Sequence, residues 1–256
     1  VSATNNVWSV SEVLGKNDNM VVEVYGNISS FTVADDNDTM TTAMKVSGTT
    51  QGSAQSVDTG AALAGQIITA KAGSIVSSVD ASSPVSSLVS GNKTIDLAAY
   101  KFTATNDNYN LTEVVVKFAN TDAASNISSV VLKDGATTLG SAPVVYDGTI
   151  YKATFTGLNS AIAADNSKIL TVSAALTDVT ATLGKSGADL KATLDSFKAN
   201  NSQGTETTEG TDRAGNSIYV YKSVPTVTNQ TLPDTLLTGG TKTLAKFSVA
   251  ADGTIC

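Results

Sequence analysis

A stretch of sequence occurs twice in this chain, at positions about 150 residues apart. The first copy runs from Ala64 to Ile95 and the second from Ala214 to Leu244. Both contain an Ala-Gly pair, a proline, a leucine, a glycine and a Lys-Thr pair, in that order. A period of this size matches an ordinary domain. We therefore expect tandem copies of one folding unit.

The repeat predicts three parts in a chain of 256 residues. Residues 1–73 are expected to be the C-terminal part of one unit, residues 74–223 a complete unit, and residues 224–256 the first strands of a third. Shared low-complexity composition is the alternative explanation. The coincidence of the proline, glycine and Lys-Thr matches at one offset argues against it.

A second match lies upstream, where Ser29–Asp36 resembles Asp195–Ser202. Each follows a run that we interpret as a strand, Val21–Gly26 in the first copy and Asp189–Leu194 in the second. On this alignment the first copy carries a long loop from Asn37 to about Leu63, because surface loops vary most between copies.

The complete unit is rich in strand and turn signals. Only 5% of the residues are aromatic and 15% are charged, so we expect a core of Val, Ile, Leu and Ala under a surface of Ser, Thr, Asn and Asp. Apolar and polar residues alternate within the unit, and Asp-Gly pairs indicate tight turns. The segments with these signals are Leu111–Ala119, Val130–Leu139, Val144–Phe155 and Ile169–Leu176.

Ala188–Phe197 fits either a helical stripe or a strand, and we favour the strand because its counterpart Val21–Gly26 is β-branched. The predicted fold class is all-β, with tandem immunoglobulin-like antiparallel β-sandwich domains. A barrel of alternating strands and helices would need helical segments, and none is convincing.

The composition argues against several functions. The chain has no histidine, which removes the commonest general base and most zinc ligand sets, so we expect no enzyme activity. Its net charge is −7 and Arg213 is its only arginine, which argues against nucleic-acid binding. No apolar run approaches the ~20 residues of a membrane span, so we expect no membrane insertion by this segment.

Oxygen-rich loops are the candidate metal sites. Asp35, Asp36 and Asp38 form the densest carboxylate cluster, and calcium prefers such oxygen ligands. Calcium is the one cofactor that the sequence suggests, and a solvated turn is the alternative. Asn106-Asp107-Asn108 is a weaker candidate of the same kind.

Candidate modification sites are of two kinds. Cys256, the only cysteine, is either an ordinary residue near a truncation point or a site of intermolecular crosslinking or lipid attachment. N-glycosylation sequons, which chance also produces in a chain so rich in Asn, Ser and Thr, begin at Asn27, Asn37, Asn92, Asn110, Asn126, Asn200 and Asn229.

The run from Tyr219 to Pro233 and the run from Gly239 to Gly253 resemble the linker and first strands of tandem domains in bacterial surface and surface-layer proteins. The resemblance covers roughly residues 74–256 and implies an array that coats or projects from the cell. Some pilus and adhesin sandwiches carry Lys–Asn isopeptide crosslinks, for which Lys101 and Lys117 are the candidates here.

The leading functional hypothesis is a non-catalytic, extracellular cell-surface protein that associates with copies of itself in a surface layer or filament. The alternative is an adhesin arm that binds a host protein or glycan through loops at one end of a sandwich. The stretch from Asn37 to Leu63 is the best candidate for such a loop.

Overall fold

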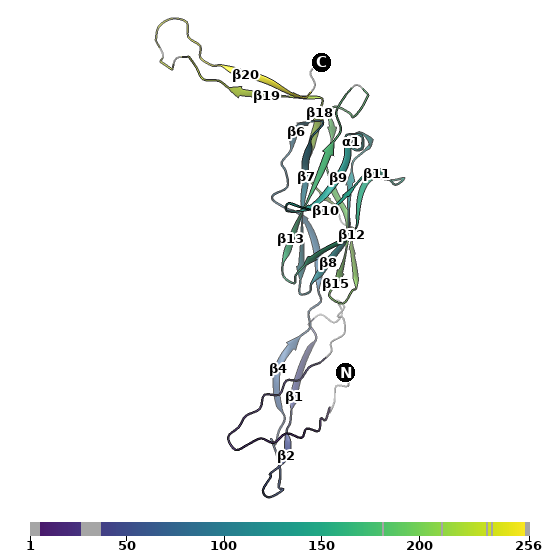
Figure 1. The fold of residues 1–256 in the computed structure, drawn as a ribbon, viewed down its shortest axis with the longest axis vertical. Coiled ribbons are helices and arrows are strands. Elements are labelled where there is room, and N and C mark those ends of the chain that lie inside the picture. Colours follow the sequence, from purple (N-terminus) through teal and green to yellow (C-terminus); the bar gives the residue numbers. More distant parts are fainter. Residues whose placement is uncertain are drawn as a thin grey trace. The chain divides into compact units, whose positions relative to one another are not determined.

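The computed structural model describes residues 6–26, 37–180, 182–210, 212–233, 235–236 and 238–253. The chain divides into two compact units, Val1–Ser30 and Phe31–Cys256. Most of the second unit is a sandwich of two sheets, drawn in blue-grey, teal and green in Figure 1. The fold-class prediction of an all-β protein with antiparallel sheets is confirmed.

The first sheet of the sandwich has the strand order β10-β9-β13-β7-β5, and all its neighbours are antiparallel. Its edges are β5 on one side and β10 on the other. The strand bounds are Ser74–Val79 for β5, Thr94–Thr105 for β7, Ile127–Asp134 for β9, Thr137–Ala142 for β10 and Ser167–Leu176 for β13.

The second sheet has the order β11-β12-β8-β15-β16, with β17 also paired to β15. The strand bounds are Tyr109–Phe118 for β8, Val145–Tyr146 for β11, Tyr151–Ile162 for β12, Thr193–Asn201 for β15, Glu206–Glu209 for β16 and Arg213–Ala214 for β17. A small third sheet joins β14 (Ala188–Asp189), β18 (Ile218–Tyr221) and β6 (Ser87–Ser90), and β18 runs parallel to β6.

The core lies between the two large sheets. Tyr100 and Phe102 of β7 face Val116 of β8 and Phe197 of β15, and all four side chains are at most 1% exposed. The Phe102 and Phe197 rings meet edge to face, with centroids 5.1 Å apart, a favourable geometry for aromatic pairs. The buried Tyr100 hydroxyl donates to the Ala192 carbonyl at 2.9 Å. Small aliphatic residues fill the remaining space, as the composition predicts.

A short helix and a buried asparagine organise one end of the sandwich. Helix α1 spans Thr121–Ser125, and the Asn120 side chain caps it by accepting from Ala123 N at 3.0 Å. Asn126 follows the helix and is fully buried. Its Nδ2 donates to the carbonyls of Asp122 and Lys185, and its Oδ1 accepts from Lys185 N, so this side chain ties the helix to a distant loop.

The predicted strands of the sandwich are confirmed. Val114, Val116 and Phe118 are buried, as are Leu170 and Val172. Val145-Tyr146 and Tyr151 form the predicted hairpin around Asp147-Gly148, and Asp134-Gly135 lies at the β9–β10 turn. The ambiguous stretch Ala188–Phe197 contains β14 and the start of β15, so the choice of strand over helix is confirmed.

Two sequence predictions in the N-terminal third are wrong. Val21–Gly26 is not paired as a strand and is exposed, because an isolated β-segment without a hydrogen-bonded neighbour is not stable. The stretch from Asn37 to Leu63 is not a long loop. It contains β1 (Thr39–Met44), which pairs with β4 (Leu63–Thr69), and between them β2 (Ser47–Thr49), which pairs with β3 (Ser56–Asp58).

The described C-terminal residues form one further antiparallel pair. β19 (Ser223–Asn229) pairs with β20 (Phe247–Gly253) over seven residues of each strand. Val227, Phe247 and Val249 on this pair are between 61% and 70% exposed. Gly239-Gly240 lies in the connection between them, and Gly240 has a φ of +104°.

Candidate functional site: a charged sheet face and a closed sheet edge

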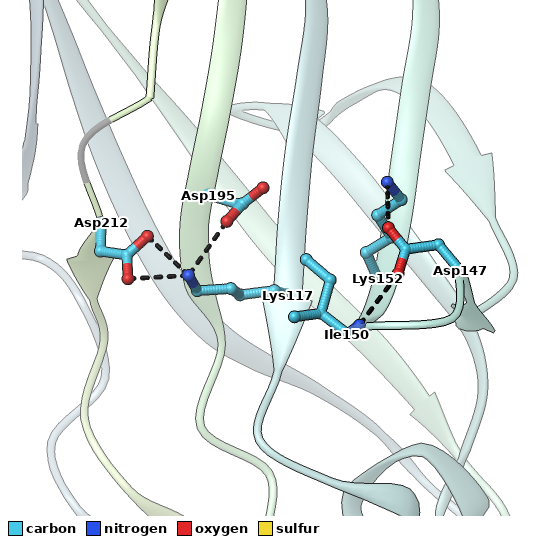
Figure 2. Close-up of polar contacts among 6 residues, drawn as sticks. All are labelled: Lys117, Asp147, Ile150, Lys152, Asp195 and Asp212. Carbon is cyan, nitrogen blue, oxygen red and sulfur yellow. Dashed lines mark hydrogen bonds and ion pairs between the residues drawn. The ribbon is translucent and has the colours of Figure 1, made fainter.

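The outer face of the second sheet carries a cluster of charged side chains. Lys117 extends from β8 toward Asp195 on β15 and toward Asp212, as Figure 2 shows. Its Nζ lies 2.7 Å from Asp212 Oδ1 and 3.0 Å from Asp195 Oδ1. The hydrogen bond to Asp212 is the largest cause of a raised Lys117 pKa, and partial desolvation opposes it. Lys117 is therefore held as an ammonium ion.

A second charged contact stabilises the β11–β12 hairpin. Asp147 Oδ1 accepts from the backbone N–H groups of Thr149 and Ile150, both at 2.9 Å, and its Oδ2 lies 2.7 Å from Lys152 Nζ (Figure 2). These bonds, the one from Ile150 first, lower the Asp147 pKa well below its usual range. The arrangement is that of an Asx turn reinforced by an ion pair.

The surroundings of Lys117 disfavour an isopeptide bond. An amide bond between Lys117 and a side-chain carbonyl would need a neutral amine as nucleophile, whereas the two carboxylates favour the charged form. Lys101, the other candidate for an isopeptide bond, is half-buried on β7 between β5 and β13.

One edge of the sandwich is closed by side chains from the opposite sheet. Glu209 Oε2 accepts from the Ser77 backbone N–H at 3.1 Å and from its hydroxyl at 3.2 Å. Arg213 Nε donates to the Ser77 carbonyl at 2.8 Å, and the Arg213 guanidinium also binds Glu209 Oε1 at 2.8 Å. The backbone groups at the centre of edge strand β5 are thus occupied, which disfavours addition of another strand there.

The candidate calcium cluster is only partly visible. Asp35 and Asp36 lie outside the described residues, and Asp38 is exposed immediately before β1. No group of three or more metal-ligating side chains gathers within the described ranges. Calcium binding at Asp35, Asp36 and Asp38 stays a prediction.

The second oxygen-rich loop uses its polar groups internally. Asn108 Oδ1 accepts from Ala164 N at 2.9 Å, and Asn106 N donates to Asp165 Oδ1 at 3.0 Å. Asn106 Nδ2 donates to the Ala72 carbonyl at 3.1 Å, which ties this loop to the segment that leads into β5. The loop therefore fastens neighbouring connections to the sandwich.

The sequon asparagines occupy different environments. Asn27 lies outside the described residues, while Asn37, Asn92 and Asn229 are exposed. Asn126 is buried as described above, and Asn110 and Asn200 are half-buried and face each other in the β8–β15 register. Glycosylation stays a prediction, and the three exposed positions are the most accessible of those described.

Sequence reasoning missed the closed edge of β5 and the ion pairs of Lys117 with Asp195 and Asp212. Glu209, Arg213 and Ser77 are more than 130 residues apart at their extremes, and only the sheet topology brings them together. The one available signal was the solitary arginine, which we used only to argue against nucleic-acid binding. Cys256 lies outside the described residues.

No protein-family model matches the sequence, and no curated protein matches it. Among solved structures, 22 chains match. A variant of BcpA, the major pilin subunit of Bacillus cereus, is 9% identical with a TM-score of 0.32, and the match covers 71% of this chain and 50% of the pilin. BcpA itself is 9% identical with a TM-score of 0.28, over 72% of this chain and 49% of the pilin.

A family 123 glycoside hydrolase from Clostridium perfringens is 7% identical with a TM-score of 0.31, over 57% of this chain and 27% of the enzyme. The chain therefore spans about half the length of the pilins and less of the hydrolase. Likeness at this level carries no argument about function. Within the described ranges, no helix has the length and apolar character needed to cross a bilayer.

Proposed function

We propose that this chain is a non-catalytic segment of an extracellular array of repeated β-sandwiches, in which units associate with copies of themselves in a surface layer or filament. The observation that carries the proposal is that strand pairs outside the sandwich repeat pairs inside it, in nearly the same register.

The N-terminal repeat is seen in β1 and β4. Ala43 pairs with Ala64 and Met44 with Leu63, while in the sandwich Thr193 pairs with Ala214 and Leu194 with Arg213. All four positions are displaced by 150 residues. The β2–β3 hairpin likewise repeats the β15–β16 pairing, with Ser47↔Asp58 matching Phe197↔Glu209 at displacements of 150 and 151.

The repeated Ala-Gly pair has a physical reason. A Cβ at Gly65 would lie 3.1 Å from the Thr42 carbonyl oxygen, and a Cβ at Gly215 would lie 3.0 Å from the Ala192 carbonyl oxygen. Both contacts are tighter than most Cβ contacts, and each brings the same two positions of the repeat together. Glycine is therefore favoured in both copies by the same close approach of two backbones.

The C-terminal repeat is seen in β19 and β20. Ser223 pairs with Gly253 and Thr228 with Ser248, as Ser74 pairs with Thr105 and Val79 with Tyr100. The displacement is 149 residues on the first strand and 148 on the second. Repetition on both sides of one sandwich supports an array, since an array places identical surfaces at regular intervals.

The surface chemistry agrees with a structural role. Ion pairs occupy the outer face of the second sheet, Ser77 at the centre of edge strand β5 is bound by Glu209 and Arg213, and the sequence has no histidine. A chain of this kind contributes spacing and contact surfaces. We place it outside the cell because its sequence resembles tandem domains of bacterial surface proteins and only 15% of its residues are charged.

Immunogold labelling tests the proposal directly. Antibodies raised against residues 74–223 should label the surface of intact source cells or filaments projecting from them. Labelling only after the cells are broken open would overturn the proposal. Binding of the purified chain to a defined glycan on an array, without lattice or filament contacts in electron micrographs, would favour the adhesin arm instead.

A further inference from the structure

The N-terminal segment repeats a turn of the sandwich. Asp18 N donates to the Gly15 carbonyl at 3.1 Å, and Asn17 has a φ of +68°. In the β12–β13 connection, Asn166 N donates to the Ala163 carbonyl at 3.2 Å, and Asp165 has a φ of +59°. Every one of these positions is displaced by 148 residues. Asparagine and aspartate adopt positive φ more readily than other residues except glycine, so this agreement supports the alignment together with the strand pattern that follows the turn.

The residues after the turn keep the pattern of strand β13. On the same displacement, Val22 and Val24 correspond to Leu170 and Val172, which point into the core and are fully buried. Val22 and Val24 are 49% and 48% exposed, whereas their neighbour Val21 is 87% exposed. The alternation of a strand persists in Val21–Gly26 although no strand forms there.

In the sandwich, β13 has a neighbour on each side. Leu170 lies opposite Tyr100 of β7, and Val172 lies opposite Leu132 of β9. Residues 6–26 expose many large apolar side chains to water, which is energetically unfavourable for so short a segment. They are Val7, Trp8, Val10, Val13, Leu14, Met20, Val21, Val22, Val24 and Tyr25.

We propose that the apolar side of Val21–Gly26 is a strand-accepting surface and that its partner is a polypeptide segment equivalent to residues 74–148 of this chain. That segment supplies a β7-like strand on one side, a β9-like strand on the other and a β8-like strand in the facing sheet. The contact repeats, at another place in the chain, the interface that β13 makes with β7 and β9, and it is a form of β-strand addition.

The proposal fixes a register. The residue of the partner that is equivalent to Tyr100 lies opposite Val22, and the residue equivalent to Leu132 lies opposite Val24. A slip of one residue would turn both valines to the outer face, so the register is strongly selected. The register does not depend on the array's function and would hold equally in a filament or in an adhesin arm.

A fusion protein tests this contact. A second copy of residues 74–148 is placed before Val1 of the full chain, where the displacement of 148 makes Val1 the next residue of the repeat. Hydrogen exchange followed by NMR should show the amides of Val22 and Val24 slowing by at least about 100-fold, as expected when an open segment joins a cooperative sheet. The amides of the 74–223 sandwich serve as the internal reference.

Matched variants separate this contact from non-specific collapse. In the fusion, Val22→Asp should abolish the new protection, while Val21→Asp on the outer side should leave it in place. A second fusion whose added copy ends at residue 150 checks that the junction length is suitable. If neither fusion protects Val22 and Val24 while the reference sandwich stays protected, or if both fusions aggregate while the original chain is soluble, the proposal is wrong.

Discussion

The sandwich and the strand pairs on either side of it in sequence share a register but differ in burial. Phe102 on β7 is 1% exposed, whereas Ala250, which occupies the same position of the repeat on β20, is exposed. Pairing is therefore specified locally, by hydrogen bonds and turns, and survives without a core. Burial requires a second large sheet, which among the described residues only the sandwich contains.

This difference locates the stability of the molecule. A two-stranded pair without a covered face is marginal in water, because its hydrogen bonds replace bonds to water and its apolar surface stays hydrated. The sandwich removes that surface from water at about 25 cal/mol per Å². Substitutions of apolar residues should accordingly lower the free energy of unfolding much more in the sandwich than in the strand pairs outside it.

The largest expected effect compares Phe197 with Phe247. Phe197→Ala removes a ring that packs edge to face on Phe102 and is 1% exposed, so we expect a loss of about 3–5 kcal/mol in the free energy of unfolding. Phe247→Ala on β20, where the ring is 61% exposed, should cost less than about 0.5 kcal/mol. Urea denaturation followed by circular dichroism measures both.

Equal losses in the free energy of unfolding for the two variants would contradict this difference between the regions, because they would mean that β20 packs against a core in solution. The denaturant dependence provides a control. The slope against urea should be the same for both variants and the parent chain, since it follows the surface exposed on unfolding.

The next effect compares two sequon asparagines. Asn126→Ala removes a buried amide that bonds Asp122 and Lys185, leaving backbone groups unpaired, and should cost about 2–3 kcal/mol. Asn229→Ala, at an exposed position on β19, should have almost no effect on thermal unfolding. A loss well below about 2 kcal/mol in the free energy of unfolding for Asn126→Ala would show that water replaces the bonds of this side chain and that water enters this end of the sandwich.

The sequence alone predicted the parts of this fold that depend on nearby residues. Alternation identified the inward side chains of β8 and β13, and Asp-Gly pairs located two hairpins. Sequence reasoning failed where a strand depends on a partner that is distant in the chain. Val21–Gly26 has strand composition but no described neighbour, and it was aligned with Asp189–Leu194 although its turn matches the one before β13.

The region from Asn37 to Leu63 was predicted to be a loop because Ser29–Asp36 was aligned with Asp195–Ser202, whereas the strand pairs place Ala43 and Met44 at the positions of Thr193 and Leu194. Its short strands are also polar, so they lack the alternation that marks a half-buried strand. The candidate site was harder still. Lys117 was named as a candidate on its strand position alone, but its partners Asp195 and Asp212 come from distant positions. Such clusters require the topology, which one sequence does not contain.

A third effect concerns the closed edge of β5. At the position of Arg213, the corresponding residue of β4 is Leu63, so the closure belongs to the sandwich and not to the repeat as a whole. Arg213→Leu should cost about 1–2 kcal/mol through lost charge-assisted bonds to Ser77 and Glu209. It should also promote self-association through the exposed β5 edge, measured by light scattering after gel filtration.

Lys198→Leu is the matched control for Arg213→Leu, since it removes a cation from the same sheet without touching β5. That variant should stay as monomeric as the parent chain. If both variants associate to the same extent, the cause is the loss of a positive charge and not the freeing of the β5 edge. Closure of that edge by Arg213 would then not be what limits self-association.

The smallest effect is a pH dependence at the β11–β12 hairpin. Since the Asp147 pKa is lowered by the Ile150 and Thr149 N–H groups and by Lys152, its contribution is complete above the unfolded-state pKa of about 4 and declines as the pH falls toward the folded-state value. Asp147→Asn keeps an acceptor for the two N–H groups but loses the ion pair. Its melting temperature should lie slightly below that of the parent chain at pH 7, and the two should converge as the pH falls below about 4.

The difference in melting temperature should also shrink in high salt, because exposed ion pairs are screened. A deficit that persists unchanged at pH 2 would mean that hairpin geometry, and not charge, distinguishes aspartate from asparagine at this turn.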